Sequence, residues 1–501
     1  MRGRDILYKK ILQKEGETMS LKKILVSGAA ALALTGTVAT AALTTVSDPK
    51  TEPVKVACDG TGDYLLTPVY YATKNWSTEL KVVNTNTTRA IVAKVVVRES
   101  KESDEIMDFA IFLSPGDVWT ASLYEEGGEI KLKSTDDSMI IGGNQASPSN
   151  PIIIDNNRAK RDGAQNGKYH HENWHGYVEI FGAASYDPHA IDANWTKACD
   201  QMDKMKFYNA VRATPNIKSG YDVKDVDNDT LMGKATIYAE DPNVNGRRYM
   251  SINMLALENF SGEPVLTNIM GGDTKIENMS SKKANVLVEY DEALAKSNVY
   301  VMYEGDGNSV FPVRTHFTVP TKKYWFDLMS QGSITSMPAA YQVDNLYGET
   351  PAVADTPSEF AYELNPTGDE IIARNLKEKC NKCAPEELEV SGIEKENNCK
   401  ILVHEEVHFF EQTNTLPANL YDAGKPYADL LFAEGGYVDI NVSNNNYDTT
   451  GLTAPVKGLT KTTKFNGMPV VPTTFTAKKM QGIYLNNWLY NQYKNVIKPS
   501  S

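Results

Sequence analysis

Short apolar runs, many of them β-branched, recur along most of this chain and are separated by turn-forming residues. Residues 80–83 and 90–97 are rich in Val, Leu and Ile. Residues 109–113 and 118–123 form a similar pair, joined by Ser-Pro-Gly-Asp at 114–117. Strands of this length linked by tight turns are typical of antiparallel sheets. The same pattern predicts strands at residues 177–181, 235–239, 249–257, 284–290, 299–303 and 313–319.

One helix is predicted among these strands. Between residues 192 and 212, Trp195, Cys199, Met202 and Met205 recur at helical spacing. We expect the two methionines to fill a core and not to bind a metal, because thioethers adapt well to irregular apolar gaps. The chain is therefore predicted to be mainly β, with antiparallel β-sandwich domains, Ig-like or jelly-roll-like, and a few short helices.

The pattern also predicts a division into regions. After a leader at residues 42–57, the β-sandwich domain or domains span residues 58–331, and the helix near 192–212 is inserted in them. Residues 332–398 mix short helical patterns, Pro and Gly breaks and a charge-rich run, which indicates a linker or an insertion. Residues 399–501 form a C-terminal β-rich region, and no repeat of fixed period is present.

The first 41 residues predict export. From Met19 a basic Met-Ser-Leu-Lys-Lys stretch precedes the apolar run 24–38, which ends in Ala39-Thr40-Ala41. A basic region, an apolar region and a small-x-small site together form a secretory signal peptide. We expect cleavage after Ala41. Because signal peptides begin at the start of translation, we also expect Met19 to be the true start and residues 1–18 to result from a mis-called start codon.

Charge excludes some classes of partner. Residues 1–41 contain seven Lys or Arg and three Asp or Glu, so their removal takes the net charge from −13 to −17. An acidic surface repels nucleic acid and anionic lipid, so we expect no nucleic-acid partner. No later apolar run reaches the roughly 18 residues that cross a bilayer, so we expect no transmembrane segment after signal cleavage.

Several segments carry a resemblance to known proteins. They are residues 62–71 (GDYLLTPVYY), 112–120 (FLSPGDVWT), 176–179 (GYVE) and 317–322 (FTVPTK). Together they resemble an uncharacterised family of exported bacterial cell-envelope proteins, β-rich and similar to surface-layer proteins. The resemblance extends over roughly residues 58–325. It implies export and a β-rich fold, and it identifies no catalytic residue.

The sharpest enzymatic motif is His404-Glu405-Glu406-Val407-His408, which matches H-E-x-x-H. On a helix, His404 and His408 would face one way and hold zinc, Glu405 would activate a water molecule, and Glu434 could be the third ligand. Residues 401–410 fit a strand equally well, however, and histidines four apart on a strand lie ~13 Å from each other, too far for one zinc ion. We favour the strand and keep a secreted zinc metalloprotease as the alternative.

A second match, His171 to His175, falls in a predicted His-rich loop. Together with His170 it could form a surface site for a transition metal, although a solvated loop is the simpler interpretation.

Five cysteines follow the signal peptide. In an oxidising compartment disulfides are the default, and the odd number leaves at least one thiol free or paired outside the chain. Three of them and His404 also have the spacing of a Cys3His zinc knuckle, but export favours a disulfide. The sequence does not assign the pairs among Cys58, Cys199, Cys380, Cys383 and Cys399.

Calcium is the metal that the sequence favours. Asp225, Asp227 and Asp229 supply alternating carboxylates, which hard cations prefer. The segment is not an EF-hand, because Thr230 stands where the sharp-turn Gly belongs and Thr236 occupies the position of the bidentate Glu. We expect either a structural calcium loop or a solvated acidic turn.

These observations favour an exported structural or adhesive protein, such as a surface-layer or matrix component, with calcium as a candidate stabilising ion. Its partners would be copies of itself or other cell-envelope components. The zinc metalloprotease is the second hypothesis. A carbohydrate- or ligand-binding sandwich module is the third, with Trp76 or Trp174 as its aromatic platform, although core positions suit both tryptophans equally well.

Overall fold

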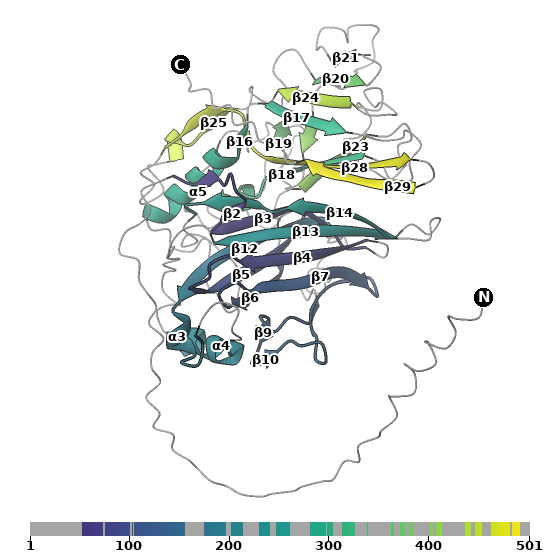
Figure 1. Cartoon of the computed structure of the whole chain (residues 1–501). Coiled ribbons are helices and arrows are strands. Elements are labelled where there is room, and N and C mark those ends of the chain that lie inside the picture. Colours follow the sequence, from purple (N-terminus) through teal and green to yellow (C-terminus); the bar gives the residue numbers. More distant parts are fainter. Residues whose placement is uncertain are drawn as a thin grey trace, which may run out of the picture. The chain divides into compact units, whose positions relative to one another are not determined.

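Figure 1 shows the computed structural model of the chain. All described residues belong to the unit Thr40–Ser501. They are residues 53–73, 76–100, 103, 105–155, 175–196, 202–213, 230–240, 247–260, 281–296, 298–303, 313–325, 338, 362–364, 371–375, 380–383, 401–403, 407–412, 436–441, 446–452, 462–480 and 483–490.

Two antiparallel sheets form the sandwich, and we call the first the central sheet. Its strands, in spatial order, are β1 (Lys55–Val56), β15 (Leu255–Glu258), β3 (Tyr64–Tyr71), β12 (His175–Tyr186), β5 (Ala90–Glu99) and β6 (Glu105–Leu113).

The second sheet is called the outer sheet. Its strands are β11 (Ile152–Asp155), β8 (Glu129–Ser134), β7 (Val118–Glu126), β4 (Trp76–Asn84), β13 (Leu231–Glu240) and β14 (Arg247–Asn253), and β2 (Thr61–Gly62) pairs with β13.

The hydrophobic core lies between these sheets. It joins Leu65, Val95 and Ile180 of the central sheet to Leu80 and Trp119 of the outer sheet, with many neighbours. In β4 and β7 buried positions alternate with more exposed ones, because only one face of the outer sheet is covered. One face of each of these strands therefore lies in the core.

The central sheet is buried on both faces. Every residue of β3, β5 and β12 is buried, which explains why these strands read as continuous apolar runs and not as alternating ones. One face packs on the outer sheet, and the other is covered by elements that come later in the chain. Among these, Phe207 contacts Phe112, Tyr290 contacts Tyr64, and the backbone of Pro68 accepts a hydrogen bond from Thr318.

The prediction of a mainly β fold with antiparallel sandwich sheets and a few short helices is confirmed. The turn predicted at residues 114–117 joins β6 to β7. Its Gly116 has a φ of 74°, a left-handed conformation that glycine adopts without steric cost.

The helix predicted over residues 192–212 forms only in its second half. Residues 188–191 make the short α3 (Pro188–Ile191), the chain then turns, and α4 (Lys204–Ala213) begins twelve residues after the predicted start at Asp192. Asp203 caps α4, because its carboxylate accepts hydrogen bonds from the backbone N–H groups of Met205 and Lys206. Asp192 instead closes a turn by accepting from the backbone of Asn194.

The strand predicted at residues 284–290 is wrong: this segment belongs to α5 (Ser281–Leu294). Leu287, Val288, Asp291 and Leu294 are buried at the three- and four-residue spacing of one helical face. A short apolar run does not separate helix from strand by itself, and here the packing partners decided for the helix.

The remaining strands form smaller antiparallel sheets. Among the described residues, the segment 332–398 contributes three strands to these sheets: β19 (Tyr362–Leu364), β20 (Ile371–Asn375) and β21 (Cys380–Cys383). In its four-stranded sheet, β20 lies between β24 (Gly436–Asn441) and β21. The two-stranded sheets pair β9 (Ile140–Ile141) with β10 (Asn144–Gln145), β16 (Ala295–Lys296) with β27 (Met468–Pro469), β19 (Tyr362–Leu364) with β22 (Ile401–Val403), and β25 (Asn446–Asp448) with β26 (Lys464–Asn466). One four-stranded sheet has the order β17 (Asn298–Tyr303), β24 (Gly436–Asn441), β20 (Ile371–Asn375) and β21 (Cys380–Cys383). The other has the order β23 (Val407–Gln412), β18 (Val313–Thr318), β28 (Val471–Met480) and β29 (Ile483–Tyr490).

Among the described residues, none of the helices combines the length and the apolarity that crossing a bilayer requires.

The core between the two sheets can be tested at Leu80, which is fully buried on β4. Leu80→Ala should lower the free energy of unfolding by about 2–5 kcal/mol, because it removes buried methyl groups and leaves a cavity. Lys81→Ala, at the exposed position next to it, should change this free energy by less than ~0.5 kcal/mol. Urea denaturation followed by circular dichroism measures both, and equal effects would contradict the assignment of the two faces.

Candidate functional site

Several buried polar contacts hold the described part of the sandwich together, and the first network surrounds Glu179 on β12. The Glu179 cluster consists of Tyr64, Arg98, Glu179, Tyr290 and Tyr324, all of them almost fully buried. In the same order, these residues come from β3, β5, β12, α5 and the segment 321–325. The cluster therefore connects three strands of the central sheet to elements that cover its second face.

Three donors meet the Glu179 carboxylate. The Nε of Arg98 and the hydroxyl of Tyr324 each donate to Oε2 at 2.6 Å, and the hydroxyl of Tyr64 donates to Oε1 at 2.9 Å. The Tyr64 hydroxyl also contacts that of Tyr290. A carboxylate removed from water is tolerated only when it is paired and hydrogen-bonded in this way.

Arg98 is equally well compensated. Its Nη1 donates to the backbone carbonyl of Ser103 at 2.8 Å, its Nη2 donates to the Tyr324 hydroxyl at 3.3 Å, and Glu105 lies 4.0 Å away. Tyr324 also stacks under the guanidinium, 5.4 Å from ring centroid to Cζ.

The tyrosines act as neutral hydrogen-bond donors. The pKa of Tyr64 and of Tyr290 lies well above the ordinary value. Burial is the larger cause, and the negative charge of Glu179 adds to it. Burial also raises the pKa of Tyr324, in spite of the opposing charge of Arg98. Because these phenols keep their protons, the arrangement holds five segments together in one closed network.

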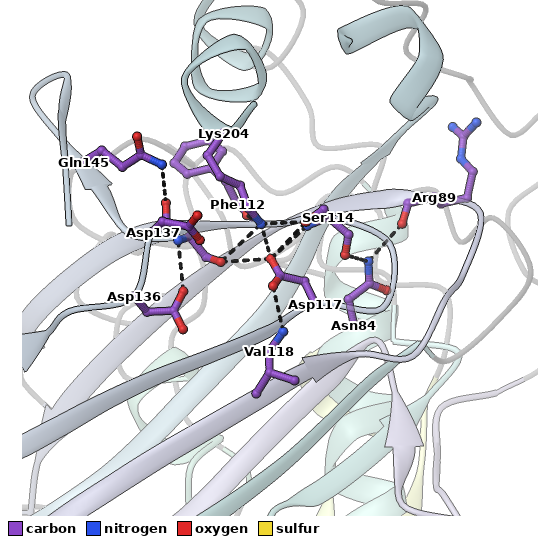
Figure 2. A network of polar contacts seen from close by, with 11 residues as sticks. Asn84, Arg89, Phe112, Ser114, Asp117, Val118, Asp136, Asp137, Gln145 and Lys204 are labelled. Atoms are coloured by element: carbon purple, nitrogen blue, oxygen red, sulfur yellow. Dashed lines mark hydrogen bonds and ion pairs between the residues drawn. The ribbon is translucent and has the colours of Figure 1, made fainter. Parts of the chain in front are cut away.

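The second network surrounds Asp117, at the end of the turn between β6 and β7. Figure 2 shows its carboxylate beside the side chain of Lys204, the first residue of α4. We call Ser114, Asp117, Ser138 and Lys204 the Asp117 network. Asp117 Oδ2 accepts hydrogen bonds from the backbone N–H of Ser114 at 3.1 Å and from the Ser138 hydroxyl at 2.9 Å, and it forms an ion pair with Lys204.

Lys204 is surrounded by oxygen acceptors. Besides Asp117, its Nζ donates to the carbonyl of Phe112 at 2.9 Å, the hydroxyl of Ser114 at 2.8 Å and the hydroxyl of Ser138 at 3.3 Å. The Lys204 side chain is 4% exposed and that of Asp117 is 20% exposed. The ion pair therefore lies at the boundary of the core, where α4 meets the turn.

Two carboxyl groups near this ion pair have pKa values shifted in opposite directions. For Asp117 burial acts to raise the pKa, but the positive charge of Lys204 and the hydrogen bonds outweigh it, so the pKa lies below the ordinary value. For Asp136, which accepts the backbone N–H of Ser138 at 3.0 Å, burial raises the pKa. Two neighbouring carboxyl groups thus differ in how readily they hold a proton.

The residues of the predicted zinc site are only partly described. His408 lies on β23, in register with Phe317 of β18, and Ile401–Val403 is also a strand. The helix that the zinc hypothesis requires is therefore not formed at His408. His404, Glu405 and Glu434 lie outside the described residues, as do Asp225, Asp227 and Asp229 of the predicted calcium loop.

The other candidates are distributed along the fold. Cys58 is exposed with a free thiol. Cys380 and Cys383 are the first and last residues of β21, and Cys199 and Cys399 lie outside the described residues. Within the part of the chain that the structure describes, no three His, Cys, Asp or Glu side chains are grouped to hold a metal ion.

The prediction of a surface loop is wrong at His175. This residue begins β12, is fully buried, and stacks on Tyr71 with ring centroids 6.0 Å apart, because the strand starts earlier than its Gly-flanked sequence indicates. His170, His171 and Trp174 lie outside the described residues. Trp76 is half-buried and packs on Tyr71, with ring centroids 4.8 Å apart.

Sequence reasoning missed both polar networks, although a signal for one was present. Lys94 and Glu179 are charged residues inside otherwise apolar strands, a pattern that indicates buried ion pairs. Lys94 is indeed fully buried, with its Nζ 2.7 Å from the carboxylate of Asp108. Asp117 and Lys204 gave no such signal, because a turn aspartate and a lysine at a helix start are both common on surfaces.

Comparison with protein-family models, with curated proteins and with solved structures gives no match for this chain.

The Glu179 cluster can be tested by removing its carboxylate. Glu179→Ala should lower the free energy of unfolding by about 3–5 kcal/mol, because it leaves the Arg98 guanidinium buried without its partner. As a control, Glu126→Ala breaks the surface pair with Lys131, where Glu126 is 66% exposed, and should cost less than ~1 kcal/mol. Urea denaturation gives both values. Replacing both partners, with Glu179→Leu and Arg98→Met, should cost less than Glu179→Ala alone, and a larger cost would contradict the explanation.

A separate prediction concerns Lys296 on β16. Burial lowers the pKa of its ammonium group from 10.5 to about 7. The unfolded chain therefore holds this proton between about pH 7 and pH 10.5, whereas the folded chain does not. Stability should rise with pH across this window by up to about 1 kcal/mol per pH unit. Lys296→Met should remove this rise and increase stability near pH 7. Urea midpoints at several pH values measure it, and an unchanged rise in Lys296→Met would assign the effect to another group.

Proposed function

We propose that this protein is an exported structural or adhesive protein of the cell surface, such as a surface-layer or matrix component. Its task would be to maintain a rigid β-sandwich outside the cell, in contact with copies of itself or with other envelope components. The predicted signal peptide and the acidic composition support the location.

One observation carries the structural part of the proposal. Two of the buried ion pairs in the described part of the sandwich join segments far apart in the sequence. Arg98 and Glu179 are 81 residues apart, and Asp117 and Lys204 are 87 residues apart. The first pair joins two neighbouring strands of the central sheet, and the second joins α4 to the turn after β6. Such ties oppose local opening, which suits a protein that has to persist outside the cell.

Fractionation of the producing cells tests the location. Antibodies raised against the purified chain should detect most of the protein in the surface extract or in the medium, with an amino terminus at Ala42 by Edman sequencing. A variant with Ala41→Lys should accumulate as an unprocessed precursor, because a charged residue at the cleavage position blocks processing. An abundant cytosolic protein that retains Met19 would reject export.

The structural part needs a second measurement on the same material. A scaffold protein should be abundant in the envelope or matrix fraction and should sediment with it after the cells are washed. A scarce monomer that remains soluble in every fraction would count against the structural role even if export is found.

A further inference from the structure

The Asp117 network has the composition of a reaction site between two side chains. A lysine amine and an aspartate carboxyl group are the two components of an amide. Here Lys204 Nζ lies directly against Asp117 Oδ2, with 4% and 20% of the side chains exposed (Figure 2). The network also supplies hydroxyl groups that contact both reacting atoms, since Ser138 Oγ lies 2.9 Å from Asp117 Oδ2 and 3.3 Å from Lys204 Nζ.

We propose that Lys204 and Asp117 become joined by an intramolecular isopeptide bond between Nζ and Cγ.

The chemistry balances without any co-reactant. The ammonium group of Lys204 first gives a proton to the Asp117 carboxylate, and the free amine then attacks Cγ. The bond between Cγ and Oδ2 breaks, and Oδ2 leaves as water with two of the three original ammonium protons. The products are one neutral amide and one water molecule, and nothing is oxidised or reduced.

The fold favours this reaction in two ways. First, it holds the amine and the carboxyl group in contact, and well-oriented intramolecular reactions reach effective molarities on the order of 10⁵–10⁸ M. Second, it replaces an ion pair that has largely been removed from water by a neutral amide, which removes the desolvation cost of two charges. Phe112 packs against Phe207 and Tyr208, with ring centroids 5.5 Å apart in both pairs, and this helps to keep water from the site.

The product amide already has its hydrogen-bond partners. Its remaining N–H keeps the carbonyl of Phe112, which lies 2.9 Å from Nζ. Its carbonyl oxygen, Asp117 Oδ1, keeps the backbone N–H of Val118 at 2.9 Å. The product amide would therefore keep hydrogen-bond partners that the two side chains already have.

Ser138 is placed to carry the proton between the two groups, because its hydroxyl contacts both of them. Behind it lies Asp136, whose carboxylate accepts the backbone N–H of Ser138 at 3.0 Å and whose pKa is raised by burial. A carboxyl group that holds its proton more readily can assist the departure of water.

The mass of the purified full chain tests the proposal. The folded protein should be lighter than its sequence by one water molecule. Trypsin should fail to cut after Lys204, and the peptide with Lys204 should be found joined to the peptide with Asp117. A folded protein with the full sequence mass would overturn the proposal, since the pair would then be ionic only.

Two variants serve as matched controls. Lys204→Arg keeps the positive charge but has no nucleophilic amine, so its mass should equal its sequence mass. It should also melt at a lower temperature than the wild type, because it lacks the covalent tie across 87 positions. A water loss that persists in Lys204→Arg would place the bond elsewhere and would overturn the assignment.

Ser138→Ala tests the proton relay. The cross-linked fraction, followed by mass spectrometry over time after synthesis, should rise at least tenfold more slowly than in the wild type. An equal rate would remove Ser138 from the mechanism. The isopeptide bond does not depend on where the protein acts. If the bond is absent, the mass shows it, whereas an error in the proposed location and role shows in the fractionation.

Discussion

The burial of the central sheet on both faces is the constraint on which the rest of the structure depends. Because β3, β5 and β12 meet no solvent, every charged side chain on their covered face must find a partner inside the protein. Arg98 meets Glu179, and Lys94 meets Asp108. Loss of one partner leaves an isolated buried charge, so the pairs restrict how the sheet and its covering elements can be arranged.

This constraint also explains the position of the covering elements. Tyr290 of α5 and Tyr324 of the segment 321–325 bring hydroxyl groups to the Glu179 cluster, so the same contacts that exclude water also satisfy the carboxylate. At the turn after β6, the last strand of the sheet, Lys204 of α4 brings its ammonium group to the carboxylate of Asp117 and the carbonyl of Phe112. Both helices therefore combine apolar burial with directed polar contacts, which fix their positions more closely than apolar packing alone.

The two networks differ in their chemical capacity. In the Glu179 cluster the cation is a guanidinium, which stays protonated and does not form amides with carboxylates under ordinary conditions. In the Asp117 network the cation is a lysine, whose amine becomes a nucleophile when it gives up a proton. In the Glu179 cluster the ion pair joins two strands of the central sheet, and tyrosines of the covering elements bind to it. In the Asp117 network the cation itself comes from a covering helix.

The sequence by itself determined the class of the fold and several of its longer strands, because apolar runs and turn residues act locally. Residues 114–117 formed the expected turn, whereas residues 284–290 became a helix and residues 192–196 did not. Those outcomes depended on packing partners far away in the chain. The partners of Arg98, Asp117, Glu179 and Lys204 were likewise decided only by the tertiary structure, since pairing over more than 80 residues leaves no periodic trace in a sequence.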